Sequence, residues 1–565
     1  MRRTLRLIFS TSPRLACAVG FLVLCRGVMP VVMLWALKVM VDVTMSQIGQ
    51  KTLDILPLAQ AGILLVSIYV CNGVTASLAQ VMRQRLSSRV SERIWRSIHK
   101  KSMMMDLSKL ENAEYQNIFF RAVNESSSKP LSVLYSLCTI VQECITAILL
   151  GAVLISLHWS MPIAIVVIGL PLVLVKVRSS RSMFNLQRKQ TKDERKRSYY
   201  SRILTLKEYA KEVRLFGLGE LFSNRYNELQ TTIRQEREAL YEKNIRREAL
   251  GQVASTLGVV SLAAIVVWRA IEGDLTAGSL ALYFMSIQRG NATAQGLMSN
   301  VASLVDTKIY LRNLFDYLDI PVDKRYALPD KSNGGVPFPR PIKRGIEVRN
   351  VSFKYPDSKR EAIKNVSFTV KPGETVALVG PNGSGKTTLV KLLCGLYRPT
   401  SGEILIDGVS INDLSANDIS DNMSAIFQDF MLYNTSAAEN INLGNIRTNA
   451  TRDSVEVAAA EAGVDKLLAS LPLGYDTLLG NLFEGSEMLS QGQWQRIALA
   501  RSFYNKNAQI IFLDEPMASL DRETRKNLLG SFHKIMQDRT AIIVSHSEET
   551  IKMADQVIDL GVIND

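Results

Sequence analysis

A glycine-rich segment between residues 380 and 388 has the composition and spacing of a phosphate-binding loop. It reads Gly380-Pro-Asn-Gly-Ser-Gly-Lys-Thr-Thr388 and joins the strand-like run Thr375–Val379 to a helical segment, Thr388–Cys394. Glycines let the backbone curl until several N–H groups face the phosphates, and the start of the helix adds positive potential. Lys386 is expected to bind the β- and γ-phosphates, and the Thr387 hydroxyl is expected to bind Mg²⁺. The predicted nucleotide-binding residues are Gly380, Pro381, Asn382, Gly383, Ser384, Gly385, Lys386, Thr387 and Thr388.

Two carboxylates follow the apolar run Ile510–Leu513, which is typical of a buried strand. Asp514, at the end of that strand, fits the Mg²⁺-binding role that phosphoryl transfer requires. Glu515 is then placed to polarise the attacking water. The alternative is a core strand with a solvated acidic end, but the glycine-rich loop upstream favours catalysis. Together with that loop, the carboxylates predict hydrolysis of ATP assisted by Mg²⁺.

The segment Leu489-Ser-Gln-Gly-Gln493, followed by Trp494-Gln-Arg-Ile-Ala-Leu-Ala-Arg501, resembles the signature of the ATP-binding cassette (ABC) transporters. The usual family sequence is LSGGQ, so Gln491 departs from it by replacing the first glycine. Further matches follow the family's order, and the resemblance covers the whole chain. They imply four more site residues: Tyr355 stacking on adenine, Gln428 of the Q-loop as a catalytic residue and Mg²⁺ ligand, Asp521 of the D-loop, and His546 as the switch histidine.

In this family the signature of one chain closes on the nucleotide held by another chain, so the resemblance implies a dimer with two composite sites. Ser490, Gly492 and Gln493 would then contact the phosphates bound by the other chain. Because Glu515 and His546 are both present, a homodimer would have two competent sites. A heterodimer is the alternative.

The first half of the chain contains apolar segments long enough to cross a bilayer as helices. The chain has 565 residues, of which 47% are hydrophobic, and one membrane half with one soluble half would give that value. A sixth segment, starting near Leu275, is interrupted by polar residues, which suits a helix that lines a protein-enclosed cavity. The five clear segments are Leu15–Leu37, Leu56–Leu78, Leu131–Leu157, Trp159–Val175 and Leu250–Trp268.

Lysine and arginine are distributed unevenly among the connecting segments. Residues 83–129 hold ten and residues 176–247 hold nineteen, whereas the links 43–54 and 269–274 hold one each. Because basic loops remain on the cytoplasmic side, both long loops and both termini are expected in the cytoplasm, with the helices in the inner (cytoplasmic) membrane. The net charge of +14 is therefore attributed to these loops. We expect contact with membrane lipids and with a transported substrate, and none with nucleic acid.

Each long basic loop predicts a helical hairpin that turns around a short helix, at Asp106–Asn117 and at Glu208–Gly217. Prolines and glycines after residue 320 then end the membrane half. We predict an α-helical six-helix transmembrane domain (residues 1–320), a linker (321–345) and an α/β P-loop ATP-binding cassette domain (346–565). All six cysteines are expected to be small buried hydrophobic residues outside any disulfide.

Three charged residues lie inside the apolar segments: Arg26, Glu143 and Arg289. A charge at the centre of a bilayer costs about 2.5–3.5 kcal/mol on insertion scales, so such residues usually face a partner or a wet cavity. One interpretation is that Arg26 pairs with Glu143, or that one of them snorkels. The other is that Arg289, with Asn291 and Gln295, lines the translocation cavity.

The resemblance implies an ATP-driven exporter, and a flanking run, Phe483-Glu-Gly-Ser486, looks more like exporters of modified peptides and other natural products. A lipid flippase or a multidrug exporter on the same scaffold is the main alternative. A soluble regulatory ATPase of the same family is disfavoured by the spanning helices. A gated channel is disfavoured because both catalytic groups are intact.

Overall fold

The computed structural model describes residues 2–48, 55–126, 129–273, 275–322, 336–356, 358–447, 451–537 and 539–563. It divides into two compact units, one formed by residues 1–98 and 118–319 and the other by residues 99–117 and 320–565. The first long loop thus turns within the unit that contains the C-terminal half of the chain. Part of the predicted linker, residues 323–335, lies outside the described residues.

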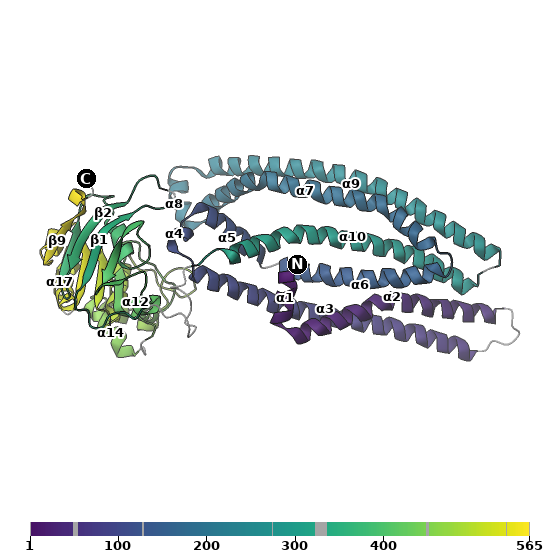
Figure 1. The fold of residues 1–565 in the computed structure, drawn as a ribbon, viewed down its shortest axis with the longest axis horizontal. Coiled ribbons are helices and arrows are strands. Elements are labelled where there is room, and N and C mark those ends of the chain that lie inside the picture. Colours follow the sequence, from purple (N-terminus) through teal and green to yellow (C-terminus); the bar gives the residue numbers. More distant parts are fainter. Residues whose placement is uncertain are drawn as a thin grey trace. The chain divides into compact units, whose positions relative to one another are not determined.

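Long helices make up the first unit (Figure 1). Among the described residues, five of them (α2, α3, α6, α7 and α9) are long and apolar enough to cross a membrane. α10 is the sixth long helix. It falls outside that group because polar residues interrupt its apolar sequence, which agrees with the weaker sixth segment predicted near Leu275. The helices are α1 (Arg2–Thr11), α2 (Pro13–Gln47), α3 (Ile55–Met103), α5 (Ala113–Ser126), α6 (Lys129–Ile155), α7 (Met161–Thr205), α8 (Lys207–Leu215), α9 (Gly219–Ile271) and α10 (Ala277–Asp319).

The spanning helices pack in a bundle whose outer faces are apolar. α7 and α9 lie side by side along much of their length, and α10 packs against α6 and α2 (Figure 1). One buried cluster, which includes Leu154, Ile165, Val266 and Ile287, joins α6, α7, α9 and α10. Exposed apolar residues remain on the outside, and Ile148 is 72% exposed. Such faces suit a lipid solvent, in which an apolar side chain loses nothing by being exposed.

The expectation that all six cysteines are buried was wrong. All six are free thiols, and three of them, Cys17, Cys71 and Cys144, are exposed, while the other three are half-buried. For the five cysteines of α2, α3 and α6, the physical reason is that an apolar segment in a membrane protein has a face toward lipid as well as a face toward its neighbours.

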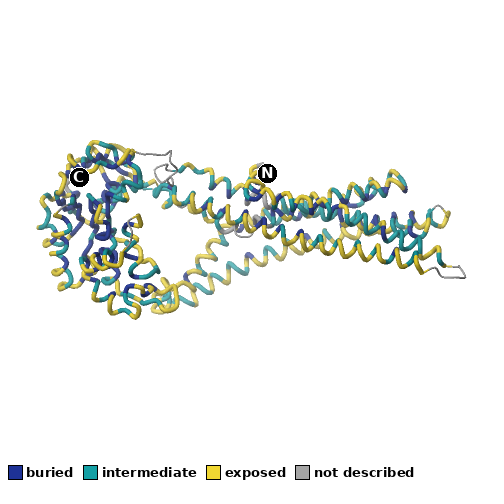
Figure 2. The backbone as a smooth tube through the Cα atoms, turned by 90° about the horizontal axis from the view of Figure 1, so that it is seen from below, coloured by how far each residue is buried: buried dark blue, intermediate teal, exposed yellow. Residues whose placement is uncertain are grey.

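The second unit contains two sheets, and buried residues are concentrated around them (Figure 2). A five-stranded parallel sheet has the order β6-β7-β8-β3-β9, and an antiparallel sheet has the order β2-β1-β4-β5. Two residues of β8 fix the register of its neighbours. Ala541 pairs with Thr375 of β3, and Thr540 pairs with Ile510 of β7. The strands are β1 (Ile346–Phe353), β2 (Ile363–Val370), β3 (Thr375–Val379), β4 (Ser401–Ile406), β5 (Val409–Ser410), β6 (Met423–Ile426), β7 (Ile510–Asp514), β8 (Thr540–Val544) and β9 (Gln556–Asp559).

Short helices surround these sheets. β7 and β8 are completely buried, which explains their continuous apolar sequences. The same unit includes α4, the short helix predicted in the first long loop, and α8 is its counterpart in the second loop. The helices of the second unit are α4 (Leu107–Leu110), α11 (Lys386–Leu393), α12 (Ala416–Asn422), α13 (Ala437–Asn442), α14 (Arg452–Glu461), α15 (Asp465–Ala469), α16 (Gln491–Tyr504), α17 (Arg522–Met536), α18 (Glu548–Ile551) and α19 (Leu560–Ile563).

Candidate nucleotide site

The glycine-rich loop connects β3 to α11 and places its backbone at the start of that helix. Gly385 has a φ of 93°, and a Cβ added there would lie 2.3 Å from the carbonyl oxygen of Ala362. Only glycine therefore fits this position. The Lys386 side chain is 7% exposed, and its ammonium donates hydrogen bonds to the carbonyls of Gly380 (2.8 Å) and Pro381 (3.0 Å). The ammonium thus lies against the curled loop that is predicted to hold the phosphates.

The topology of the parallel sheet explains why distant predicted residues converge. β3 leads into the loop, β6 is followed by Gln428, β7 ends at Asp514, and His546 follows β8. β6, β7, β8 and β3 are neighbours in one parallel sheet, so their carboxyl ends share an edge. Ligand sites of parallel α/β sheets lie at that edge.

Glu515 joins two of the predicted catalytic residues. Its carboxylate accepts a hydrogen bond of 3.2 Å from the Gln428 amide, and its other oxygen lies 3.8 Å from Nε2 of His546. The backbone of Glu515 has a φ of 48°, a left-handed conformation that costs a residue other than glycine about 1–3 kcal/mol. Such strain persists only where surrounding contacts enforce it, and here it accompanies a carboxylate placed between a glutamine and a histidine.

Asp514 is almost completely buried, with 1% exposure. Among the described residues, neither carboxylate oxygen receives a hydrogen bond of normal geometry. Burial raises the pKa of Asp514, the nearby carboxylates of Glu515 and Asp429 raise it further, and the Thr387 hydroxyl opposes the shift. A buried carboxylate with unsatisfied oxygens beside a threonine hydroxyl fits a small hard cation such as Mg²⁺, which prefers oxygen ligands.

Tyr355 lies at the edge of this site in an aromatic cluster. Its ring meets the rings of Phe353 and Tyr397 edge-on, with centroids 4.9 and 5.5 Å apart. Its hydroxyl forms a hydrogen bond of 3.0 Å with that of Thr388, which follows Thr387, the residue predicted to bind Mg²⁺. The ring is half-buried, so part of its surface remains available for stacking.

The signature segment begins α16. Ser490 is the N-cap residue, and Ser490 and Gln493 form a reciprocal capping box. A Cβ on Gly492 would lie 2.8 Å from the carbonyl oxygen of Ser519, so this glycine permits a close approach to the D-loop. The Gln491 side chain is exposed at the first position of the helix. Among the described residues, the hydrogen bonds of Ser490 and Gln493 stay within the segment, and none reaches the glycine-rich loop of the same chain.

Asp521 caps α17. Its carboxylate accepts a hydrogen bond of 2.9 Å from the Thr524 backbone N–H, and bonds from Thr524 lower its pKa. At neutral pH the side chain is therefore an anion at the start of a helix, where the helix dipole favours it.

One residue at the site was missed by the sequence analysis, although the run that contains it was noted. Gln495 of α16 donates to the carbonyl of Glu515 (3.1 Å) and accepts from the backbone N–H of Ser519 (2.9 Å). It is 4% exposed. A buried glutamine among apolar residues is the signal that could have identified it, because a buried amide needs partners.

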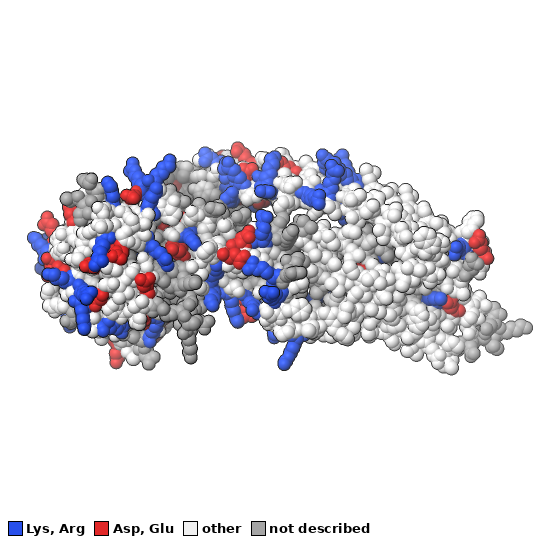
Figure 3. Space-filling view, viewed as in Figure 1, with Lys and Arg blue, Asp and Glu red and all other residues white. Residues whose placement is uncertain are grey.

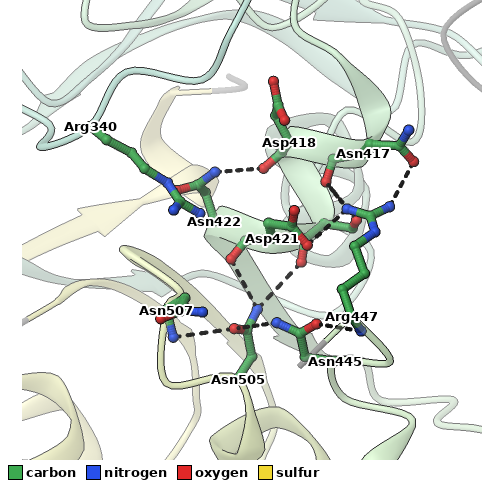
Figure 4. Close-up of polar contacts among 10 residues, drawn as sticks. Arg340, Asn417, Asp418, Asp421, Asn422, Asn445, Arg447, Asn505 and Asn507 are labelled. Atoms are coloured by element: carbon green, nitrogen blue, oxygen red, sulfur yellow. Dashed lines mark hydrogen bonds and ion pairs between the residues drawn. The ribbon is translucent and has the colours of Figure 1, made fainter. Parts of the chain in front are cut away.

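A second polar network, also missed, anchors the strand that leads to Gln428 (Figure 4). Asn505, at the end of α16, donates to the carbonyl of Asp421 at the end of α12 (3.2 Å), and it accepts from Asn445 (3.0 Å). Arg447 forms an ion pair with Asp421 (2.8 Å) and donates two hydrogen bonds to Asn417. The network fixes the start of β6 against the end of the signature helix.

Comparison with known protein families decides the identity of the fold. Residues 15–290 match the model of the ABC transporter transmembrane region, and residues 363–518 match the ABC transporter model. A relative, the ATP-dependent lipid A-core flippase of Aromatoleum aromaticum, is 33% identical over 74% of this chain and 67% of the flippase. The chain belongs to the ABC transporters. Because both regions lie in one chain, it is a half-transporter of the exporter type, a multi-pass membrane protein that binds ATP and couples its hydrolysis to transport.

Two further relatives and one solved structure cover nearly the whole half-transporter. The subtilin transport ATP-binding protein SpaT of Bacillus subtilis is 27% identical over 99% of this chain and 89% of SpaT. The nisin transport ATP-binding protein NisT of Lactococcus lactis is 27% identical over 98% of this chain and 90% of NisT. A bacterial Atm1-family ABC exporter with ATP bound has the same fold, with a TM-score of 0.75 and 23% identity, over 98% of this chain and 94% of that exporter.

Proposed function

We propose that this half-transporter is an ATP-driven exporter of the cytoplasmic membrane that works as a homodimer and exports a modified peptide or another natural product. The observation that carries the ATPase proposal is the contact of Glu515 with Gln428 and its proximity to His546. A carboxylate between an amide and an imidazole can polarise a water molecule and is oriented before the nucleotide binds. Such preorganised groups stabilise a transition state without further rearrangement.

The predicted residues then have distinct roles. Tyr355 stacks on adenine, and the loop from Gly380 to Thr388 surrounds the phosphates. Glu515 polarises the attacking water, with Gln428 and His546 orienting it. Asp514, Thr387 and Gln428 would hold Mg²⁺, which would supply positive charge to the transferred phosphoryl group. Ser490, Gly492 and Gln493 bind the nucleotide of the second chain, and Asp521 is the D-loop residue at the same interface.

Two observations support dimerisation. Ser490 and Gln493 form hydrogen bonds within the signature segment. They form none with the glycine-rich loop of the same chain among the described residues, so they are available to a nucleotide held by another chain. In addition, the spanning part of α3 is barely covered: between residues 55 and 78 only Ala61 is buried. Half-transporters of this fold work as dimers, and a second copy of this chain is the proposed partner. A heterodimer with a related chain is the alternative.

The orientation in the membrane follows from the charges. On the face drawn in Figure 3, lysine and arginine gather on the half of the bundle that contains α1, α5 and the adjoining parts of α3, α7 and α9, and the other half is mainly uncharged. The spanning segments therefore lie in the membrane, and we propose that the basic hairpins, both termini and the nucleotide site are cytoplasmic.

The substrate proposal rests on the relatives that match the chain over most of its length, which transport subtilin and nisin. A lipid flippase is the second candidate, favoured by the higher identity to the lipid A-core flippase over a shorter span. A vesicle-efflux assay with a modified peptide and a leaflet assay with a labelled lipid separate the two. Transport in the first assay alone supports peptide export, and movement of lipid alone would replace that proposal.

The ATPase proposal is tested with Glu515→Gln. The variant should bind ATP yet hydrolyse it at least about a hundredfold more slowly, because removing one such group costs about 3–4 kcal/mol in the transition state. The matched control is Glu523→Gln, on α17, which removes a carboxylate that the proposed chemistry does not use. Hydrolysis by Glu515→Gln at the wild-type rate would show that the assignment is wrong.

A further inference from the structure

A cavity of about 480 Å³ lies among four helices of the membrane unit, α2, α3, α6 and α10. Its apolar wall consists of methionine, leucine, proline and alanine side chains from α2 and α10. Its polar lining consists of Arg26, Tyr69, Asn72, Gln142, Gln288 and Arg289. The cavity therefore contains two cations and amide groups, and no carboxylate among its lining residues.

The two arginines form no close ion pair within the described residues, although the Glu143 carboxylate is near enough to Arg26 to attract it. Neither Arg26 nor Arg289 has a carboxylate within 4.0 Å there, so the interpretation in which Arg26 pairs directly with Glu143 is not supported by a close ion pair. One oxygen of Glu143 is instead buried without a hydrogen bond in the described part of the chain, near Gly296. Two like charges at one cavity repel each other, which raises the cost of placing them in the membrane.

Gln142 gives an independent indication. Its side chain is only 8% exposed and lines the cavity, yet it forms no hydrogen bond within the described residues. Gln142 is absent from the buried polar atoms that lack a partner, so its amide is open to the cavity and available to a ligand. Of the other polar residues predicted to line the path, Asn291 accepts a hydrogen bond from Ser255 of α9 (3.1 Å), and Gln295 is not part of this lining.

We propose that this cavity binds an anionic group, a carboxylate or a phosphate, on a substrate whose remaining part is apolar. Guanidinium groups bind both anions through paired N–H donors, and the Gln142 and Gln288 amides supply further hydrogen bonds. The inference rests on the proposed transport function and specifies its substrate class. A peptide carboxylate and a lipid phosphate share this chemistry, and the probes below separate them.

The experiment uses the full-length dimer in lipid nanodiscs, without nucleotide, and three probes with the same acyl-chain length. N-dodecanoylglycine carries a carboxylate, dodecyl phosphate carries a phosphate, and N-dodecanoylglycinamide is neutral. Equilibrium binding is measured after subtracting uptake by empty nanodiscs. We expect at least one anionic probe to bind about tenfold more tightly than the amide, which is the effect of a single good charge-assisted contact. The tighter of the two identifies the kind of anion.

Substitutions of Arg26 and Arg289 test whether these arginines cause the preference for an anionic probe over the neutral amide. The double variant Arg26→Gln/Arg289→Gln should reduce the preference to within about twofold, and the Arg→Lys counterparts should keep part of it because they retain the charges. Arg96→Gln, which removes an exposed charge paired with Glu92, is the matched control and should bind like the wild type. Equal binding of all three probes by the wild type, or a preference that survives in the double variant, would overturn the proposal. ATP hydrolysis is measured separately, so a failure here is distinct from a failure of the ATPase assignment.

Discussion

The hydroxyl of Tyr397 donates a hydrogen bond of 2.5 Å to the carboxylate of Glu111, in the loop that turns around α4. Tyr397 is almost completely buried, and its ring contacts those of Phe353 and Tyr355. Tyr355 in turn bonds to Thr388 at the glycine-rich loop. A continuous set of contacts therefore connects the predicted adenine-stacking residue to the first long basic loop of the chain.

Tyr397→Phe should interrupt this connection while preserving the packing of the ring. In the wild type, ATP is expected to slow hydrogen exchange in residues 107–112, because ordering Tyr355 also orders Tyr397 and Glu111. In the variant that protection should be lost, because the change removes one hydrogen bond to a charged group, worth about 1.5–3 kcal/mol. The affinity for ATP should stay within about threefold of the wild-type value, because this hydrogen bond lies outside the nucleotide contacts. The exchange is read by mass spectrometry.

The control for Tyr397→Phe is Tyr475→Phe, which changes a buried tyrosine far along the sequence, between α15 and α16. It should leave the protection of residues 107–112 at the wild-type level. Equal protection in wild type and Tyr397→Phe would mean that the hydrogen bond to Glu111 is structural and carries no signal from the nucleotide.

The nucleotide loop and its strands could be predicted from the sequence because their signals are local. The strand Thr375–Val379 was predicted with the bounds that the structure has, and the apolar run Ile510–Leu513 lies in β7. The part of α3 beyond its apolar run, which continues to Met103, was less clear because its sequence has no long apolar stretch. The bond between Tyr397 and Glu111 spans 286 residues, and only the fold brings its two ends together.

Substitution of Gln491 should have little effect on ATPase activity, whereas substitution of its neighbour Gly492 should lower it. Gln491→Gly should leave ATPase activity within about threefold, because the side chain is exposed and the helix cap is made by Ser490 and Gln493. Gly492→Ala should lower activity by at least about tenfold, because a contact of 2.8 Å with Ser519 would push α16 away from the D-loop. Steady-state hydrolysis checks both variants, and a loss of two orders of magnitude in Gln491→Gly would reveal a specific role for that glutamine.

Asp514→Asn should stabilise the protein in the absence of Mg²⁺. The folded-state pKa of Asp514 is raised above its ordinary value of 3.8, so its charge disfavours the folded state once the pH exceeds both values. The destabilisation appears as the pH rises from about 3.8 through the folded pKa, and it is fully present above that. At neutral pH the neutral variant should gain about 1–3 kcal/mol, the usual cost of an unsatisfied buried polar group.

The measurement for Asp514→Asn is thermal unfolding with and without MgATP. The variant's advantage should shrink as the pH falls toward 4, and MgATP should stabilise the wild type more than the variant. If the variant were less stable than the wild type at neutral pH without Mg²⁺, the carboxylate would have a partner that the described residues do not include.

Gln495→Met should lower the rate of hydrolysis more than the affinity for ATP. The wild-type amide bonds to the carbonyl of Glu515 and to the N–H of Ser519, while Glu515 is held in a strained left-handed conformation. Without the amide, relaxation of that strain, about 1–3 kcal/mol, is expected to move the carboxylate away from Gln428 and His546. We expect kcat to fall at least about tenfold with KM for ATP within threefold, and Gln537→Glu on the surface to behave like the wild type. A variant that unfolds more easily but keeps the wild-type kcat would show that Gln495 only packs the core, because a positioning role requires the rate to fall while nucleotide binding is preserved.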